Sequence, residues 1–327
     1  MMTLHYREKT KQHGIALIMV LLVVALVSII AVGIATNQQL NTKRTENLLN
    51  NEQAYMYLLA AEYFAKDILI EDALNNSTDS LDDIWARETA PIPVEGGLVQ
   101  GEIEDLQSFV NINSLVDGNG QINANQLAVL RNLINELSSQ QPEIVIPDNY
   151  QQAIADWIDS DLDARAPGGA EDGEYLNKTL PYIAANQYFT NKSELILVNG
   201  FNYINFSQLS PYITALPDTV STINVNTADA MLISSLSNQI SFNDANEIIK
   251  ARPQKGYADN AAFLNLPEVK NKNVNPDLIT VRSDYFLLTA HAIIGSSKSN
   301  LYSLLYREST GNNQYQVKVL LRSQRRI

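Results

Sequence analysis

The strongest constraint on this chain is an apolar run near its N-terminus. No side chain from Gly14 to Thr42 is ionisable, and residues 15–35 are almost wholly apolar. A helix of about 20 such residues spans the hydrocarbon core of a bilayer, whereas the apolar part of a cleaved secretory signal has only about 7–15. The run therefore predicts a single-pass membrane anchor.

Charge and composition on either side extend this prediction. Arg7, Lys9 and Lys11 precede the run against a single Glu8, and such a cationic flank stays on the cytoplasmic side, which sends the C-terminal part across the membrane. Residues 38–74 continue with good helix formers and with apolar residues at helical spacing. We expect one very long helix with an apolar half and an amphipathic half.

The segment "KQHGIALIMVLLVVALVSII" resembles the N-terminus of type IV prepilins and pseudopilins. The resemblance implies that a prepilin peptidase cleaves between Gly14 and Ile15 and methylates the new N-terminus. Most of that family has Glu at the fifth mature position, where it neutralises the amine of a neighbouring subunit, but here this position is Met19.

Two interpretations of Met19 stay open. It is an ordinary lipid-facing residue of an anchor, or the missing Glu is meaningful. A carboxylate among apolar helices costs several kcal/mol unless it is paired. A subunit without it has no partner for the amine of a subunit above it, and would fit the end of a filament.

The remainder predicts a sheet interrupted by helices. Residues 75–97 are typical of a loop, residues 98–116 alternate as two short strands, and residues 283–327 indicate a strand meander with a turn at "GNN". The middle has helical spacing and N-cap signals between Pro, Gly and Asn breaks. We predict an α+β fold in which one antiparallel sheet carries a large α-helical insert.

Several further motifs resemble the K subunit, a large minor pseudopilin of type II secretion systems. They are "GEIEDLQSFVNINSLV", "DWIDSDLDARAPGGAEDGEYL", "SELILVNGF" and "INVNTADAMLISSL", in that order. The resemblance implies a pilin-like fold with these parts: a leader at 1–14, a transmembrane and assembly helix at 15–74, a sheet region at 75–116 and 281–327, and an insert at 117–280 in two SAM-like or helix-hairpin-like parts, about 117–215 and 216–280.

The same resemblance implies a function. The chain would be a single-pass protein of the inner membrane with its C-terminal domain in the periplasm. It would initiate or cap the secretion pseudopilus at its tip and support export of folded proteins across the outer membrane. Its implied partners are the I and J minor pseudopilins, other pseudopilins and the prepilin peptidase.

An acidic segment at residues 156–175 is the main candidate for a bound ligand. Asp159, Asp161 and Asp163 begin like an EF-hand, but the sixth position is Ala164 and the twelfth is Ala170, so an EF-hand is excluded. From the residues alone, a solvated acidic loop and a different calcium loop both remain open.

The family resemblance favours structural calcium in this segment. It implies Asp159, Asp161, Glu171 and Asp172 as ligands, with Asp163 and backbone carbonyls as second candidates. Residues 117–125, "DGNGQINAN", also alternate Asx oxygens but lack a Glu at the twelfth position, so we interpret them as a turn.

The alternative function is a membrane-anchored, exported helix-hairpin-helix DNA receptor, because residues 223–269 resemble such domains. However, the turn "SNQIS" has no Gly, and Lys250, Arg252 and Lys255 are the only nearby cations. The formal net charge of −13 also disfavours phosphates. We therefore expect no nucleic-acid partner.

Catalysis is not expected either. Cysteine is absent, and His291 is the only histidine after the apolar run. The sequence offers no nucleophile elbow, phosphate loop, zinc motif or His-based general base. We predict that the chain is not an enzyme.

Overall fold

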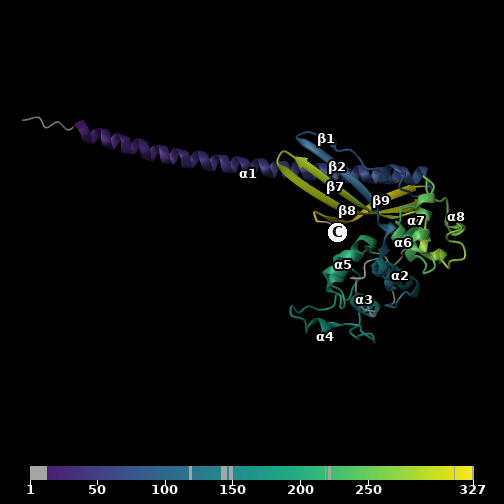
Figure 1. Ribbon diagram of the computed structural model, residues 1–327. Helices are drawn as coiled ribbons and strands as arrows, with labels where there is room; N and C mark the ends of the chain where they lie inside the picture. Colours follow the sequence, from purple (N-terminus) through teal and green to yellow (C-terminus); the bar gives the residue numbers. More distant parts are fainter. Residues whose placement is uncertain are drawn as a thin grey trace, which may run out of the picture.

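The computed structural model describes residues 13–117, 120–140, 146, 150–217, 219, 222–312 and 314–325. Figure 1 shows a long helix that projects far beyond a β-sheet, with a group of shorter helices below the sheet. Of the predicted leader, residues 1–14, only His13 and Gly14 lie within the described residues.

The projecting element is α1, His13–Asn75, an unbroken helix of 63 residues. It contains no Pro and only one interior Gly beyond its first turn, Gly33, so nothing in the sequence interrupts it. The N-terminal half of α1 is exposed. Among the described residues, α1 is the one helix that is long and apolar enough to cross a membrane. This helix fits a single-pass membrane anchor, as the apolar run predicted.

The C-terminal half of α1 packs on the sheet. Ala54, Leu58, Ala65 and Leu69 are buried and share one hydrophobic core with residues such as Phe286 of the sheet. The small Ala side chains bring the helix close to the strands. One half of α1 is therefore fixed in the folded body while the other half extends away from it (Figure 1).

The five-stranded sheet has the order β1-β2-β7-β8-β9, and every neighbouring pair is antiparallel. Its strands are β1 (Ile92–Val94), β2 (Gly97–Asp105), β7 (Tyr285–Ile294), β8 (Ser297–Gly311) and β9 (Gln314–Ser323). Strands β7, β8 and β9 form the predicted C-terminal meander. The α+β class, with its long helix and antiparallel sheet, is confirmed.

The chain between β2 and β7, residues 106–284, is the insert, and most of its buried residues form a hydrophobic core of their own. Its helices are α2 (Ala124–Gln140), α3 (Tyr150–Ile158), α4 (Asp172–Tyr175), α5 (Tyr203–Leu209), α6 (Ala230–Ser235), α7 (Phe242–Ala251) and α8 (Asn260–Leu264). Each half of the insert is closed by a short parallel pair: β3 (Val110–Asn111) with β4 (Ile213–Thr214) in the first half, and β5 (Ile223–Asn224) with β6 (Ile279–Thr280) in the second.

Short 3₁₀ helices complete the fold, at Ile84–Ala86, Leu106–Ser108, Ile112–Leu115, Lys192–Leu197, Ser210–Tyr212 and Pro276–Leu278. Residues 75–97, expected to be a loop, also contain the edge strand β1. The "SELILVNG" segment, expected to be helical, begins in the 3₁₀ helix at Lys192–Leu197, whose capping box pairs Asn191 with Glu194.

The prediction of two strands in residues 98–116 is half wrong. β2 ends at Asp105, and the second alternating stretch folds mainly as 3₁₀ turns. Asn113 donates hydrogen bonds to the carbonyls of Phe189 and Leu216, and Asn111 accepts one from the Leu216 amide. Buried Asn side chains thus replace the ladder that alternation alone would predict.

Candidate functional site

The structure brings together three of the four predicted calcium ligands. One carboxylate oxygen from each of Asp159, Asp161 and Glu171 lies within 4.8 Å of the others. The local fold explains this meeting: α3 ends at Ile158, the chain then forms a loop, and Glu171 is the N-cap residue of α4. We call these three residues the insert cluster.

The guanidinium of Arg165 balances part of the negative charge in and beside the insert cluster. Arg165 forms an ion pair with Asp156 at 2.9 Å and a second with Asp159. The loop folds tightly around this pair. A Cβ on Gly169 would lie only 2.1 Å from Oδ2 of Asp156. Glycine is therefore required at this close approach.

Glu171 is the least satisfied member of the cluster. Its side chain is buried, and neither carboxylate oxygen has a hydrogen-bond partner. Burial, followed by the charges of Asp156, Asp159, Asp161 and Asp172, raises the pKa of Glu171 to about 7. Buried carboxylate oxygens without donors fit a hard cation, which takes oxygen ligands. The residues present therefore suit a bound metal ion.

The other predicted ligands, Asp172 and Asp163, are not members of the insert cluster. Oδ1 of Asp172 accepts a hydrogen bond from the Ala184 amide at 2.9 Å, and Asp172 is outside the insert cluster. Asp163 is exposed, and its amide donates to Oδ1 of Asp161 at 2.9 Å. The turn expected at Asp117 is present, with the Gly120 amide donating to the Asp117 carbonyl, although residues 118 and 119 lie outside the described residues.

The predicted processing and assembly residues lie on the free half of α1. Gly14 and Ile15 are in its first turn, and Met19 is 64% exposed on the same apolar surface. Every large apolar side chain in this stretch is exposed in the isolated chain. Such a continuous apolar surface requires a lipid or protein partner.

The cations of the hairpin-like region do not form a surface for phosphates. Nη2 of Arg252 donates to the Ala228 carbonyl at 2.6 Å, and Lys250 pairs with Glu247 at 2.8 Å. Lys255 lies among acidic residues at the end of α1, in a shared cavity. These contacts do not support the DNA-receptor alternative.

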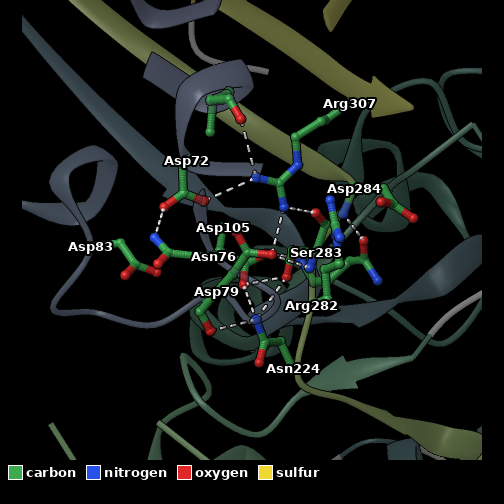
Figure 2. A network of polar contacts seen from close by, with 12 residues as sticks. Asp72, Asn76, Asp79, Asp83, Asp105, Asn224, Arg282, Ser283, Asp284 and Arg307 are labelled. Atoms are coloured by element: carbon green, nitrogen blue, oxygen red, sulfur yellow. Dashed lines mark hydrogen bonds and ion pairs between the residues drawn. The ribbon is translucent and has the colours of Figure 1, made fainter. Parts of the chain in front are cut away.

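A buried polar network that the sequence did not predict joins the three parts of the fold (Figure 2). At its centre is Arg307 of β8, which is 1% exposed. Its guanidinium pairs with Asp72 of α1 at 3.2 Å and with Asp79 at 2.5 Å, and donates to the Ser283 carbonyl at 2.6 Å. The guanidinium also lies over the ring of Phe286.

Asp105, at the end of β2, continues the network into the insert. Its Oδ2 accepts hydrogen bonds from Thr227 at 2.6 Å, Ser283 at 2.7 Å and Asn224 at 3.1 Å. Complete burial, which outweighs these donors, raises the pKa of Asp105 to about 6. Helix α1, the sheet and the insert thus meet in one set of charged and hydrogen-bonded side chains.

One sequence signal could have indicated this network. Leu301 and Leu305 of β8 are buried toward α1, and Arg307 follows on the same face because side chains alternate with a period of two. A charged residue on an apolar face implies a buried partner. Nothing in the sequence, however, identifies that partner as Asp72, 235 residues away.

Comparisons with known proteins agree with the geometry. Two family models described as type II secretion system, protein K, match residues 108–218 and 223–282. Type II secretion system protein K of Aeromonas hydrophila is 32% identical over 312 residues, covering 91% of this chain and 93% of that protein. Its counterpart from Pseudomonas aeruginosa is 32% identical over 310 residues, covering 92% and 90% respectively.

The fold is also similar to a solved structure. It matches the crystal structure of the GspK-GspI-GspJ complex from the enterotoxigenic Escherichia coli type 2 secretion system with a TM-score of 0.73 and 26% identity. The match covers 87% of this chain and 100% of the solved one.

Proposed function

Because the chain belongs to the type II secretion system protein K family, we propose that it is a minor pseudopilin that initiates or caps the pseudopilus at its tip and supports export of folded proteins. The observation that carries this proposal is the similarity to the solved GspK-GspI-GspJ complex over nearly the whole chain. The role is structural rather than catalytic.

The partners follow from the same similarity. The I and J minor pseudopilins of the same system would contact the exposed half of α1, where exposed apolar side chains continue beyond the membrane-spanning run at Leu40, Leu48 and Leu49. The test is co-purification of the three subunits from detergent-solubilised membranes. Recovery of this chain without I or J, while I and J still associate, would contradict the proposal.

Membrane orientation and processing form a second part of the proposal. The cationic residues before α1 would hold the leader in the cytoplasm and place the sheet and insert in the periplasm. The prepilin peptidase would cleave between Gly14 and Ile15. Mass spectrometry of the mature chain should show a methylated N-terminal Ile15, and an intact leader would rule this processing out.

Met19 would mark the end of the filament. An exposed apolar side chain at this position packs against neighbouring helices but offers no carboxylate for the amine of a subunit above. This chain would therefore accept subunits on one side only.

The insert cluster would bind structural calcium. Asp159, Asp161 and Glu171 supply convergent oxygens, and Asp172 is the proposed fourth ligand because its charge already acts on Glu171. A bound Ca²⁺ would relieve the repulsion among these carboxylates and fix the loop between α3 and α4. The alternative, a membrane-anchored DNA receptor, is not supported, since the relatives are secretion-system proteins and the cations near α7 contact groups of this chain.

A further inference from the structure

The end of α1 carries a second group of carboxylates, distant from the insert cluster in the sequence. Asp72 lies in the last turn of α1, and Asp79 and Asp83 follow in the next loop. One oxygen from each lies within 4.8 Å of the others. We call these three residues the junction cluster, and Figure 2 shows them gathered around Asn76.

The charges around the junction cluster do not balance. The cluster and the cavity beside it hold five carboxylates, from Glu71, Asp72, Asp79, Asp82 and Asp83, and Asp105 and Asp284 add negative charge near Asp79. The nearby cationic side chains are those of Arg87, Lys255, Arg282 and Arg307. Negative charge is therefore in excess around the cluster, and a bound cation would offset it.

Asp79 independently indicates that the junction cluster suits a ligand. Its side chain is 1% exposed, and its Oδ2 accepts from Arg307 and from the Ser283 amide at 2.8 Å. Its Oδ1 is buried and has no hydrogen-bond partner. A buried carboxylate oxygen without a donor costs free energy, and a cation would satisfy it.

A cation has both a route and further ligands here. A cavity of about 260 Å³ adjoins the cluster, lined among others by Asp72, Asp83, Asn75, Asn76 and Thr78. All of these side chains offer oxygen, and no His lines the cavity. The potential ligands among the lining side chains are therefore oxygen atoms, which suit hard cations such as Ca²⁺ or Mg²⁺ and disfavour zinc or copper.

We propose that Asp72, Asp79 and Asp83 bind a hard divalent cation at the junction of α1 with the sheet. Asp72 and Asp79 also hold Arg307, and Asp79 contacts Ser283, so the ion completes the network that joins the helix to β8 and to the insert. This site is additional to the calcium proposed for the insert cluster and does not depend on it.

The two tryptophans of the chain allow the two sites to be observed separately. Trp85 follows Asp83 by two residues, and Trp157 precedes Asp159 by two. Terbium, a luminescent substitute for calcium, emits when an excited Trp lies close to it. The experiment uses the detergent-solubilised full chain, stripped with EDTA and excited selectively through Trp.

The variants isolate the junction signal. The double variant Glu171→Gln/Trp157→Phe removes the insert site and its Trp, and we expect it to retain saturable terbium emission through Trp85. Adding Asp83→Asn should weaken terbium binding at least tenfold. Adding Asp82→Asn instead is the matched control, because Asp82 lines the same cavity but is outside the cluster, and it should change binding less than threefold.

Competition identifies the ion. Unlabelled Ca²⁺ or Mg²⁺ at millimolar concentration should displace terbium, and the stronger competitor is the better candidate. The proposal is overturned if the double variant shows no saturable emission, or if Asp82→Asn and Asp83→Asn weaken it equally. Trp85 fluorescence without metal verifies that each variant is folded, since Trp85 is buried against Phe286.

Discussion

Arg307 of β8 and Asp72 of α1 form an ion pair inside the protein, with 3.2 Å between Nη1 and Oδ2 and with both side chains at most 5% exposed. The guanidinium also binds Asp79, so a single side chain holds the last turn of the long helix and the loop that follows it. The attachment of α1 to the sheet therefore depends on charge as well as on apolar packing.

Replacing Arg307 by Met should lower the free energy of unfolding by about 3–5 kcal/mol, because two buried carboxylates lose their cation. Urea denaturation of the detergent-solubilised chain measures this loss. Arg282→Met is the control: the Arg282 guanidinium donates to the Tyr315 hydroxyl and lies over its ring, and its charge acts on Asp284, but it forms no ion pair within the described residues. Its loss should cost about 1 kcal/mol or less. Equal costs for both variants would show that the network contributes little.

Calcium should raise the melting temperature of the chain through the insert cluster. Stabilisation grows with occupancy and reaches about 2.7 kcal/mol at a calcium concentration 100 times the Kd. Glu171→Gln or Asp159→Ala should remove the part of this gain that the insert cluster contributes. Glu174→Gln, an exposed carboxylate of α4 outside the cluster, should retain it.

A melting temperature that calcium leaves unchanged, together with tolerance of both substitutions, would reject the insert site. Asp172→Asn is a separate test, because this carboxylate already accepts the Ala184 amide. If Asp172 is the fourth ligand, its substitution should weaken calcium binding without abolishing it.

Asp105 should make stability depend on pH. Its pKa is raised from 3.8 to about 6 in the folded chain, so the folded state binds more protons than the unfolded state between these values. The contribution of Asp105 to stability is therefore greatest below about pH 4 and falls as the pH rises to about 6, by on the order of 1–3 kcal/mol.

Asp105→Asn removes this titration. The difference in unfolding free energy between wild type and variant, measured in excess EDTA, should decrease from pH 4 to pH 6 and stay constant above that. A constant difference across the whole range would show that the Asp105 pKa is not raised.

Met19→Glu should change where the subunit is found in the filament. The new carboxylate can pair with the N-terminal amine of a subunit above, so labelled chains should appear within pseudopili as well as at one end. Met19→Leu keeps an apolar side chain and should remain at the end. Immunogold labelling of assembled pseudopili distinguishes these outcomes, and terminal labelling for both variants would contradict the role of Met19.

The elements with strong periodic patterns were predictable from the sequence. The apolar run and the helix formers after it indicated α1, and alternation indicated β2 and the C-terminal meander. The stretch around Asn111 and Asn113 was not predictable, because these side chains bond to backbone groups far away in the sequence. The alternating apolar residues of this stretch are buried, but most of the stretch does not pair with another strand.

The candidate sites divide in the same way. Asp159, Asp161 and Glu171 lie close together in the sequence, so their meeting in one loop could be predicted. The Arg307 network could not, since its members come from α1, β2, β8, the middle of the insert and its C-terminal end, and only the folded chain brings them together (Figure 2).

Because α1 is unbroken, it would couple movement of its N-terminal half in the membrane to movement of the folded body. Its 63 residues make a rod about 95 Å long, rising 1.5 Å per residue, with its C-terminal end locked to the sheet. Without a hinge, each turn that leaves the bilayer raises the sheet and insert by about 5.4 Å along the axis. In the proposed assembly, the height of the folded body above the membrane would therefore report how far the anchor has been withdrawn.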